Sequence, residues 1–295
     1  MESNISVIVA SYNSMNCIDR CVYSILGSIG VTIELIIIDD CSTDRTWEYI
    51  QKFADKAILI RNEKNHKGAN YSYNLGLRMA TSKWICFMDH DDEVLPGRFI
   101  TQFHYNNLAP IISCNHFVIS NKGTHEVEYN LRNNFKAGEV FRSLLSADKN
   151  GLHVQPQNLL VDKNICPGFS EEFPSEDFGF LVELFKGRSC YHINKPYLIR
   201  HINNNNLGSS LDYKLSTLEV RKRLFFPGYF KECKKGLKWQ HSLTARYYFH
   251  NGDGVNCRKH LIKGELTSKN VFLYITSFLN ITRKIVISKF NILGK

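Results

Sequence analysis

The sequence has no pair of cysteines at the Cys-x-x-Cys spacing that is typical of zinc and redox sites. Its nine cysteines are an odd number scattered along 295 residues, and the close pair, Cys17 and Cys21, has helical spacing. Several others stand inside apolar runs, where cysteine behaves as a small hydrophobic residue. This usage argues against a disulfide framework or a zinc site. It favours a reduced compartment, so we expect a cytoplasmic protein.

Long apolar runs are also missing. No stretch reaches the roughly 18 apolar residues that a membrane-spanning helix needs. The longest candidate, residues 271–281, is too short and is followed by Arg283 and Lys284. The N-terminal apolar run, Ile5 to Ala10, has only six residues and no basic residue before it. We therefore expect neither a spanning segment nor a signal peptide.

Acidic residues are scarce in the last quarter of the chain. Residues 221–295 hold 16 Lys and Arg against 3 Asp and Glu, a net charge of +13, whereas residues 1–220 hold 21 against 25, a net charge of −4. A basic tail on a nearly neutral body favours an anionic partner, either the inner face of the plasma membrane or a nucleic acid. No DNA- or RNA-binding motif appears, so the membrane surface is preferred. Solvated helix faces are the plainer alternative.

The first 107 residues alternate between short β-rich runs and helical periods. Apolar runs predict strands at residues 5–10, 32–39, 57–60 and 84–88. Helices are expected at residues 16–27, after Thr43 or Asp44, at residues 70–79 and near Pro96. This rhythm predicts an α/β fold whose parallel sheet is covered by helices.

The pattern changes beyond residue 107. Residues 111–120 and 124–130 are expected to form antiparallel strands joined by a turn. Helices are expected at residues 136–146 and 175–187, followed by two short strands, SCYHIN and YLIRHI. Helical periods dominate from about residue 211 onward. We therefore expect a mixed sheet followed by a helical region.

Three polar clusters come directly after expected strands: residues 11–13, 39–44 and 89–92. Ligands of parallel α/β sheets bind outside the carboxyl ends of the strands. Asp89 and Asp91, two residues apart on extended backbone, can point the same way. Mg²⁺ or Mn²⁺ typically takes one or two carboxylates together with phosphate and water oxygens. We predict a site for such a cation and a phosphorylated ligand. Turn formation or helix capping is the alternative, and it is preferred for Asp92 and Glu93.

Three motifs taken together identify a family resemblance. The segments ISVIVASYN, ELIIIDDCSTDRT and NLGLRMATSKWICFMDHDDEVLP resemble the family 2 glycosyltransferases of GT-A fold, and CPGFSEEFPSEDFGFLVELF resembles the acceptor-side segment of that family. The resemblance implies a GT-A domain over residues 1–210, with a Rossmann-like nucleotide-sugar half (1–107) and an acceptor half (108–210). A basic helical C-terminal region would follow (211–295).

The resemblance also implies roles on the donor side. Tyr12 would lie against the nucleotide base, and Asp40 would accept a hydrogen bond from it, with Asp39 as a further candidate for this pocket. A carboxylate suits the imide N–H of uracil, so a UDP-sugar is the favoured donor. Asp89 would face the ribose or the metal, and Asp91 would ligate the metal. Simple packing remains the alternative for Tyr12, and helix capping the alternative for Asp40.

On the acceptor side, the resemblance makes Asp177 the catalytic base, and Glu176 would orient the acceptor or Asp177. An acid favoured by a helix N-terminus is the alternative for Asp177. The sequence departs from the family at Tyr73, where members commonly carry an arginine that helps to bind the diphosphate. Lys67 is the candidate replacement. His201 is a further candidate metal ligand or phosphate contact.

The resemblance implies an inverting transfer of a hexose or N-acetylhexosamine, assisted by Mn²⁺ or Mg²⁺. The UDP-sugar would be the donor, and the acceptor would be a glycan or lipid-linked glycan of a bacterial surface polysaccharide. Two alternatives remain open. A sugar-nucleotide nucleotidyltransferase is expected to have a basic Gly-rich loop after its first strand, which VASYNSMNC lacks. A non-catalytic membrane-docking module with the same fold is the other, against which the intact Asp91 and Asp177 argue.

Overall fold

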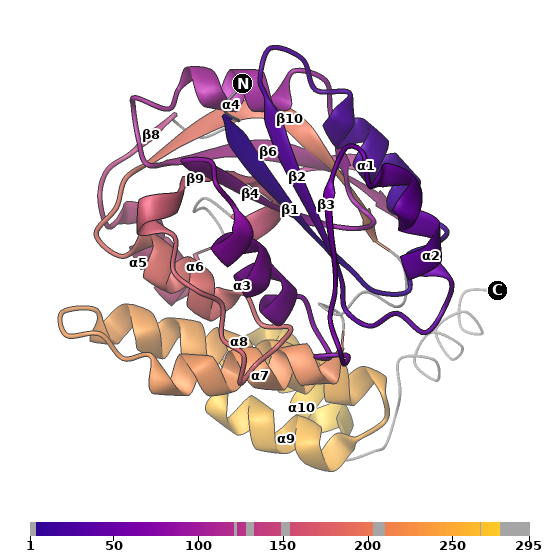
Figure 1. Cartoon of the computed structure of the whole chain (residues 1–295). Helices are drawn as coiled ribbons and strands as arrows, with labels where there is room; N and C mark the ends of the chain where they lie inside the picture. Colours follow the sequence, from indigo (N-terminus) through magenta and orange to yellow (C-terminus); the bar gives the residue numbers. More distant parts are fainter. Residues whose placement is uncertain are drawn as a thin grey trace. The chain divides into compact units, whose positions relative to one another are not determined.

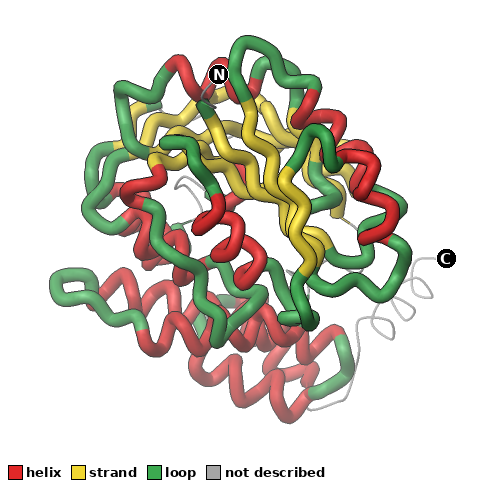
Figure 2. The backbone as a smooth tube through the Cα atoms, in the orientation of Figure 1, coloured by secondary structure: helices red, strands yellow, loops and turns green. Residues whose placement is uncertain are grey.

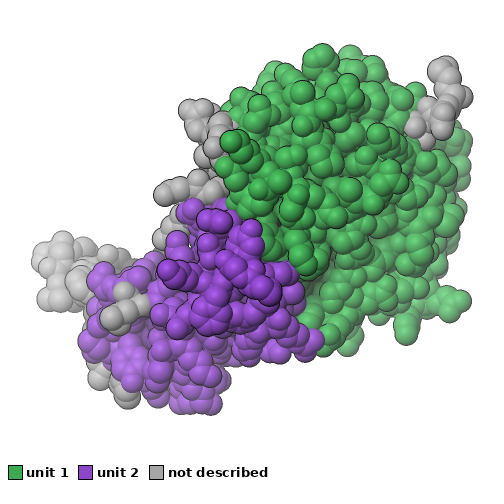
Figure 3. Space-filling model, turned by 90° about the vertical axis from the view of Figure 1, so that its left-hand side faces the viewer, with its two compact units in different colours: residues 1–141, 150–206 green, residues 142–149, 207–295 purple. Residues whose placement is uncertain are grey.

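The computed structural model describes residues 4–120, 123–127, 133–148, 154–202, 210–265 and 267–277. The chain divides into two compact units, residues 1–141 with 150–206 and residues 142–149 with 207–295 (Figure 3). The first unit contains all the described strands and the second is helical, which confirms the predicted α/β fold with a helical C-terminal region (Figure 1). The functional division predicted at residues 107 and 210 stays a prediction.

A mixed sheet in the order β3-β2-β1-β4-β9-β6-β10-β5 forms the centre of the first unit (Figure 2). Its parallel half contains β1 (Ile5–Ser11), β2 (Ile33–Asp39), β3 (Ile58–Arg61) and β4 (Trp84–Asp89). The other half contains β6 (Ile111–Ser120), β9 (Leu159–Asp162), β10 (Cys190–Ile202) and β5 (Glu93–Val94), with β7 (Gly123–Val127) on β6 and β8 (Asn134–Phe135) on β10. The sequence did not predict β9, which pairs antiparallel with both β4 and β6 and so joins the two halves.

Helices cover both faces of the parallel half. They are α1 (Ile18–Leu26), α2 (Thr46–Ile50) and α3 (Asn70–Met79), and the unit also contains α4 (Arg98–His104), α6 (Phe178–Phe185) and the start of α5 (Glu139–Ser146). Short 3-10 helices lie at Gln51–Phe53, Pro156–Asn158 and Lys163–Ile165. In Figure 1, α1 and α2 lie on one side of the sheet and α3 on the other.

The side-chain alternation of β1 explains this two-sided packing, because successive residues of a strand point to opposite faces. Val7 and Val9 belong to the same buried cluster as the apolar face of α1, which is Ile18, Cys21, Val22 and Ile25. Ile8 points to the opposite face, where α3 packs closely. A Cβ on Gly76 of α3 would clash with Ile8 and would lie 3.0 Å from Ile38 Cδ1, so only glycine fits there.

Two local predictions were wrong. The two strands predicted around Pro196 are one strand, β10, whose pairing with β6 is irregular on both sides of that proline. Proline removes one ladder hydrogen bond, yet the flanking apolar residues keep the strand on the sheet. The second error concerns Asp92 and Glu93, which do not begin a helix. Glu93 starts β5 and pairs with β10, and α4 begins only at Arg98.

The second unit is built from α7 (Leu211–Arg223), α8 (Phe230–His250), α9 (Gly254–Lys263) and α10 (Ser268–Ser277). The side chains of Ser210 and Asp253 cap α7 and α9 by accepting hydrogen bonds from backbone N–H groups. Ala245, Phe249, Cys257, Leu261 and Leu273 form its buried core. All nine cysteines of the chain are free thiols.

No helix in the described part of the chain combines the length and apolarity needed to cross a bilayer. The polar run Asn203 to Asn206 and the end of the basic tail from residue 278, both noted in the sequence, lie outside the described residues.

Candidate active site

The three predicted polar clusters meet at the carboxyl edge of the parallel strands. The strand register places Ser11 of β1 beside Asp39 of β2, and Ala10 of β1 beside Asp89 of β4. The residues that follow these strands therefore share one end of the sheet, where ligands of parallel α/β folds bind.

The loops after β1 and β2 are tied together by hydrogen bonds. Asn13 Oδ1 accepts hydrogen bonds from the backbone N of Thr43 (2.9 Å) and of Asp44 (3.3 Å). The backbone N of Ser14 donates to Thr46 Oγ1 at 2.8 Å. Tyr12 stands on this fixed loop with 39% of its surface exposed, so its ring is available to a ligand.

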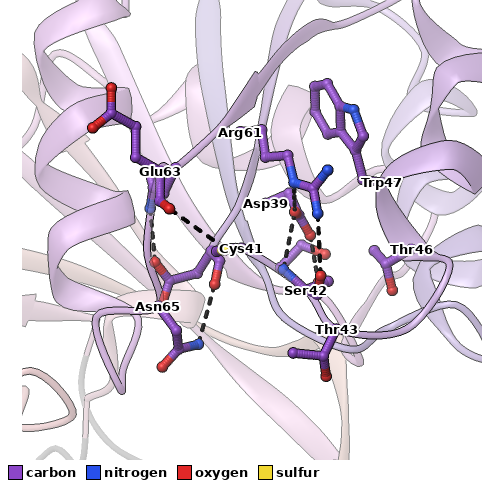
Figure 4. Close-up of polar contacts among 12 residues, drawn as sticks. Asp39, Cys41, Ser42, Thr43, Thr46, Trp47, Arg61, Glu63 and Asn65 are labelled. Carbon is purple, nitrogen blue, oxygen red and sulfur yellow. Dashed lines mark hydrogen bonds and ion pairs between the residues drawn. The ribbon is translucent and has the colours of Figure 1, made fainter.

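Asp39 is fully buried and serves the turn that follows β2 (Figure 4). Its carboxylate accepts hydrogen bonds from the backbone N (3.1 Å) and the hydroxyl of Ser42, and Arg61 Nε lies 3.5 Å away. Burial raises the pKa of the Asp39 carboxyl, while the Ser42 hydrogen bonds and Arg61 act in the opposite direction. These partners favour a structural role for Asp39, and its contact with a nucleotide base stays a prediction.

Asp40 anchors the next loop, which carries Lys67. Its carboxylate accepts hydrogen bonds from His66 Nδ1 (2.7 Å), from the backbone N of His66 (2.8 Å) and from Asn62 Nδ2 (2.8 Å). The His66 ring stacks on Tyr71 with a centroid distance of 3.6 Å. The loop is thus held at both its start and its middle, and the side chain of Lys67 is exposed beside it.

Both oxygens of the Asp89 carboxylate have hydrogen-bond donors. Tyr73 Oη donates to Oδ1 at 2.6 Å and Gln157 Nε2 donates to Oδ2 at 2.9 Å. Tyr73 is 2% exposed, and its ring packs against Phe87 and Phe169. Burial and then the charge of Asp89 raise the pKa of the Tyr73 hydroxyl well above its usual value, so it remains a proton donor to Asp89. A neutral donor therefore occupies the position at which the resembling family commonly has arginine.

Asp91 has different surroundings from Asp89. Its carboxylate forms no hydrogen bond or ion pair with another residue of the described ranges, although its backbone carbonyl accepts from Arg20 Nη2 at 2.9 Å. Burial and then the charge of Asp89 raise the pKa of the Asp91 carboxyl. Its negative charge is thus poorly compensated by the protein and suits a cation.

Protein ligands alone do not complete a metal site here. Over the described residues, no group of three or more His, Cys, Asp or Glu side chains is arranged to hold an ion. Mg²⁺ and Mn²⁺ are commonly bound by one or two carboxylates, with substrate phosphates and water filling the other positions. The pair Asp89 and Asp91 fits that kind of site, which a phosphorylated substrate would complete.

The acids that follow are engaged with β10. Asp92 is 2% exposed and lies 3.7 Å from Arg200 Nε; burial and then the charge of Asp89 raise the pKa of its carboxyl well above the usual value. Glu93 Oε1 lies 2.5 Å from His201 Nε2 and 3.8 Å from Arg20 Nε. Glu93 thus engages Nε2 of the His201 ring. The metal or phosphate contact of His201 stays a prediction.

Glu176 and Asp177 stand at the start of α6, but only the Glu176 side chain caps the helix. The Glu176 carboxylate is buried and accepts hydrogen bonds from the backbone N of Phe178 (2.7 Å) and of Gly179 (3.1 Å). Asp177 is the N-cap residue, but its side chain does not cap the helix. The role of Asp177 as the base stays a prediction, as does the alternative that the helix N-terminus favours an acid there. An acceptor contact of Glu176 stays a prediction.

The segment before Asp177 is fixed to α3 by two asparagines. Asn70 Nδ2 lies within 2.8–2.9 Å of the carbonyl oxygens of Ser170, Phe173 and Glu176. Asn74 exchanges hydrogen bonds with the backbone of Phe169, at 2.7 and 3.0 Å. Sequence reasoning missed this connection. The available signal was two asparagines four residues apart on one side of α3.

A second contact joins the same segment to the loop of Lys67. Ser175 Oγ donates to the Lys67 carbonyl at 3.1 Å, and a Cβ on Gly68 would clash with the Pro174 carbonyl. The backbone before Asp177 therefore lies directly against the loop that Asp40 anchors. This arrangement brings the candidate base and the candidate nucleotide residues into one connected structure.

Comparison with known proteins gives one family match. The family model described as Glycosyl transferase family 2 matches residues 6–160. A relative in Escherichia coli, UDP-Glc:alpha-D-GlcNAc-diphosphoundecaprenol beta-1,3-glucosyltransferase WfaP, is 37% identical over 101 residues, 34% of this chain and 40% of that protein. GalNAc(5)-diNAcBac-PP-undecaprenol beta-1,3-glucosyltransferase of Campylobacter jejuni is 28% identical over 204 residues, 67% of this chain and 64% of that protein. The chain thus matches less than two thirds of either relative.

Solved structures show the same fold. S. aureus TarS 1-349 superposes with a TM-score of 0.65 at 16% identity, over 94% of this chain and 79% of that one. Structures of TarS 1-349 with UDP and with UDP-GlcNAc superpose with the same TM-score of 0.65. At this identity the likeness concerns the fold alone, and it confirms the predicted GT-A fold.

Proposed function

Because the chain belongs to glycosyl transferase family 2, we propose that it is an inverting glycosyltransferase of bacterial polysaccharide biosynthesis. The donor is a UDP-sugar carrying a hexose or an N-acetylhexosamine. The acceptor is a glycan or lipid-linked glycan of a surface polysaccharide, such as lipopolysaccharide or capsule. Support comes from the two relatives, which are named as glucosyltransferases with diphosphoundecaprenol or PP-undecaprenol acceptors, and from the UDP and UDP-GlcNAc complexes of TarS.

The observation that carries the proposal is the contrast between Asp89 and Asp91 at the carboxyl edge of the sheet. Asp89 is held by two neutral donors, and Asp91 has a carboxylate without a partner among the described residues. One fixed and one unengaged acid suit a cation that arrives with a diphosphate. A purely structural cluster of acids would be expected to pair each carboxylate with a donor or a base.

On the donor side, Tyr12 stacks on the uracil and Asp40 accepts the imide N–H. Asp40 Oδ2 accepts a single described hydrogen bond, from the backbone N of His66. A carboxylate oxygen has room for a second, so the base can bind without displacing the loop. Lys67 approaches the diphosphate from this loop and supplies the positive charge that Tyr73 does not.

The leaving group is stabilised where Asp89 and Asp91 lie. When Mn²⁺ or Mg²⁺ is bound there, it acts as a Lewis acid toward the departing nucleoside diphosphate. Asp91 would hold the ion directly, and Asp89 would face the ribose or the same ion. Tyr73 and Gln157 keep the Asp89 carboxylate in one orientation throughout.

Asp177 acts on the acceptor. A sugar hydroxyl is a weak nucleophile at neutral pH, so a positioned carboxylate removes its proton as the oxygen attacks the anomeric carbon. Asn70 and Asn74 keep the segment before Asp177 in place. The base and the leaving group lie on opposite faces of the sugar. A single displacement therefore inverts the anomeric centre.

The test is a Mn²⁺-dependent donor hydrolysis and transfer assay over UDP- and GDP-sugars. We expect signal with a UDP-sugar, and a loss of at least about 100-fold in kcat/KM for Asp91→Asn and Asp177→Asn. Asp55→Asn, an exposed acid away from the site, is the matched control. Synthesis of a sugar nucleotide from UTP and a sugar phosphate would instead support the nucleotidyltransferase. Full activity in both variants would refute the assignment.

A further inference from the structure

The corner between α7 and α8 exposes aromatic side chains. Phe225 and Phe230 are 41% and 62% exposed, and their ring centroids lie 5.7 Å apart. Both belong to the helical unit, and neither is part of its buried core. An exposed apolar area rimmed by polar residues is the kind of feature that marks interaction sites.

Four lysines follow on the first half of α8. Lys231, Lys234, Lys235 and Lys238 are all exposed. At 100° per residue they fall within an arc of about 100°, and Phe230 widens this arc to about 140°. The lysines and Phe230 therefore share one side of the helix, and Phe225, which precedes the helix, lies against Phe230. We call these six residues the α8 surface.

The charges of the α8 surface are not neutralised within the described chain. No ion pair joins any of the four lysines to a described acid; the nearby Glu232 lies 3.7 Å from Arg142 instead. The end of α7 differs, because Glu219 lies within 3.1–3.3 Å of Lys222 and Arg223 and offsets their charge. The net positive charge of this corner is concentrated on α8.

Packing does not explain these lysines. Farther along α8 the same side of the helix is buried, at His241, Ser242 and Ala245. On this side of α8, the first half of the helix carries exposed lysines, whereas the second half carries buried residues. This change along one helix indicates that the first half of α8 forms a surface with a function other than packing.

We propose that the α8 surface docks the protein on an anionic lipid bilayer. Phe225 and Phe230 would enter the boundary between headgroups and acyl chains, as aromatic residues of interfacial helices do. The lysines would lay their aliphatic stems along the bilayer and keep their ammonium groups at the lipid phosphates. Each lysine near such a surface contributes up to about fivefold in partitioning. The proposal does not depend on the proposed catalysis, although a lipid-linked acceptor would be presented there.

The test is co-sedimentation of the full chain with vesicles of phosphatidylcholine alone or of phosphatidylcholine with roughly one third of the anionic lipid phosphatidylglycerol. We expect binding to the anionic vesicles only, and weaker binding at higher salt. Replacing the four lysines with glutamine should lower the partition coefficient at least about tenfold. Phe225→Ser with Phe230→Ser should also weaken binding while its salt dependence remains. The charge-matched control replaces the exposed Lys56, Lys83, Lys136 and Lys186 with glutamine.

Three results would overturn the proposal. One is an absence of binding to anionic vesicles, and another is equal loss of binding in the control. The third is binding of RNA or DNA, but not of vesicles, that depends on the four lysines. Transfer to a soluble acceptor should be unchanged in the lysine variant. A failure of docking is thereby distinguished from a failure of the proposed function, since vesicle binding needs no sugar donor.

Discussion

Asp89 and Asp91 are two residues apart, yet their carboxylates have different surroundings. The sequence placed both acids at the end of a strand and predicted a shared role. The structure separates them, because Tyr73 and Gln157 reach only Asp89. At the scale of single residues, the unanticipated feature is the set of neutral donors that orients one acid of the pair.

Tyr73→Phe tests this orientation. The substitution removes one hydroxyl donor and leaves the ring among Phe87 and Phe169. A hydrogen bond to a charged group contributes about 1.5–3 kcal/mol, so we expect the donor KM and the Kd for Mn²⁺ to rise at least about tenfold. Titration of Mn²⁺ by electron paramagnetic resonance gives the second value without catalysis. Tyr71→Phe, on the same helix, is the control. Unchanged Mn²⁺ affinity in Tyr73→Phe would show that Asp89 needs no such donor.

At the scale of elements, the apolar runs predicted β1 to β4 and β6 to within about two residues, because a buried strand reads as a continuous β-branched segment. Strand β9 escaped prediction. It has only four residues, and its place between β4 and β6 comes from segments far away in the sequence. The sequence also did not predict that α3 holds the segment before Asp177, because its asparagines bind backbone groups about 100 residues later in the chain.

Asn70→Ala tests whether α3 positions the candidate base. Removing the amide takes a hydrogen-bond donor away from the carbonyl oxygens of Ser170, Phe173 and Glu176 and loosens the segment before Asp177. We expect kcat to fall at least about tenfold while the donor KM changes less than about threefold, with a loss of about 1–3 kcal/mol in the free energy of unfolding. Steady-state kinetics with thermal unfolding provides both values. Asn106→Ala removes an amide elsewhere in the same unit as a control. A rise in donor KM as large as the fall in kcat would instead place the effect on the nucleotide-binding residues.

At the scale of the whole molecule, the chain consists of two units with separate cores, and the helical one contains a histidine pair. His241 Nδ1 and His260 Nδ1 lie 3.0 Å apart, so one donates and the other accepts. Burial and then His260 lower the pKa of His241 to about 4; burial and then Lys263 lower the pKa of His260. Lys222 and Lys259 add positive charge, and Tyr248 stacks on His260. All of these neighbours favour the neutral pair.

This pair predicts a pH dependence of stability. Both folded-state pKa values lie below the usual 6.5, so the folded state binds fewer protons than the unfolded state between about pH 4 and 6.5. The stabilisation is complete above pH 6.5 and is lost as the pH falls toward 4, by up to about 3 kcal/mol for His241. Urea unfolding of the full chain, followed by Trp239 fluorescence with Trp47 and Trp84 replaced by Phe, measures it. His241→Gln should flatten the dependence, and His104→Gln should not. A flat profile in the parent chain would contradict the prediction.

The sequence by itself determined the alternation of strands and helices, the apolar faces, and the order of the polar motifs that identify the family. These depend on residue periodicity and short-range chemistry, which are readable along the chain. Only the tertiary structure decided which acids are engaged. Asp39 and Asp40 became anchors of loops, Glu176 became a helix cap, and Asp91 was left without a described partner. The physical reason is that a carboxylate's role depends on the donors around it. Those donors come from residues that are distant in sequence and become neighbours only when the sheet assembles.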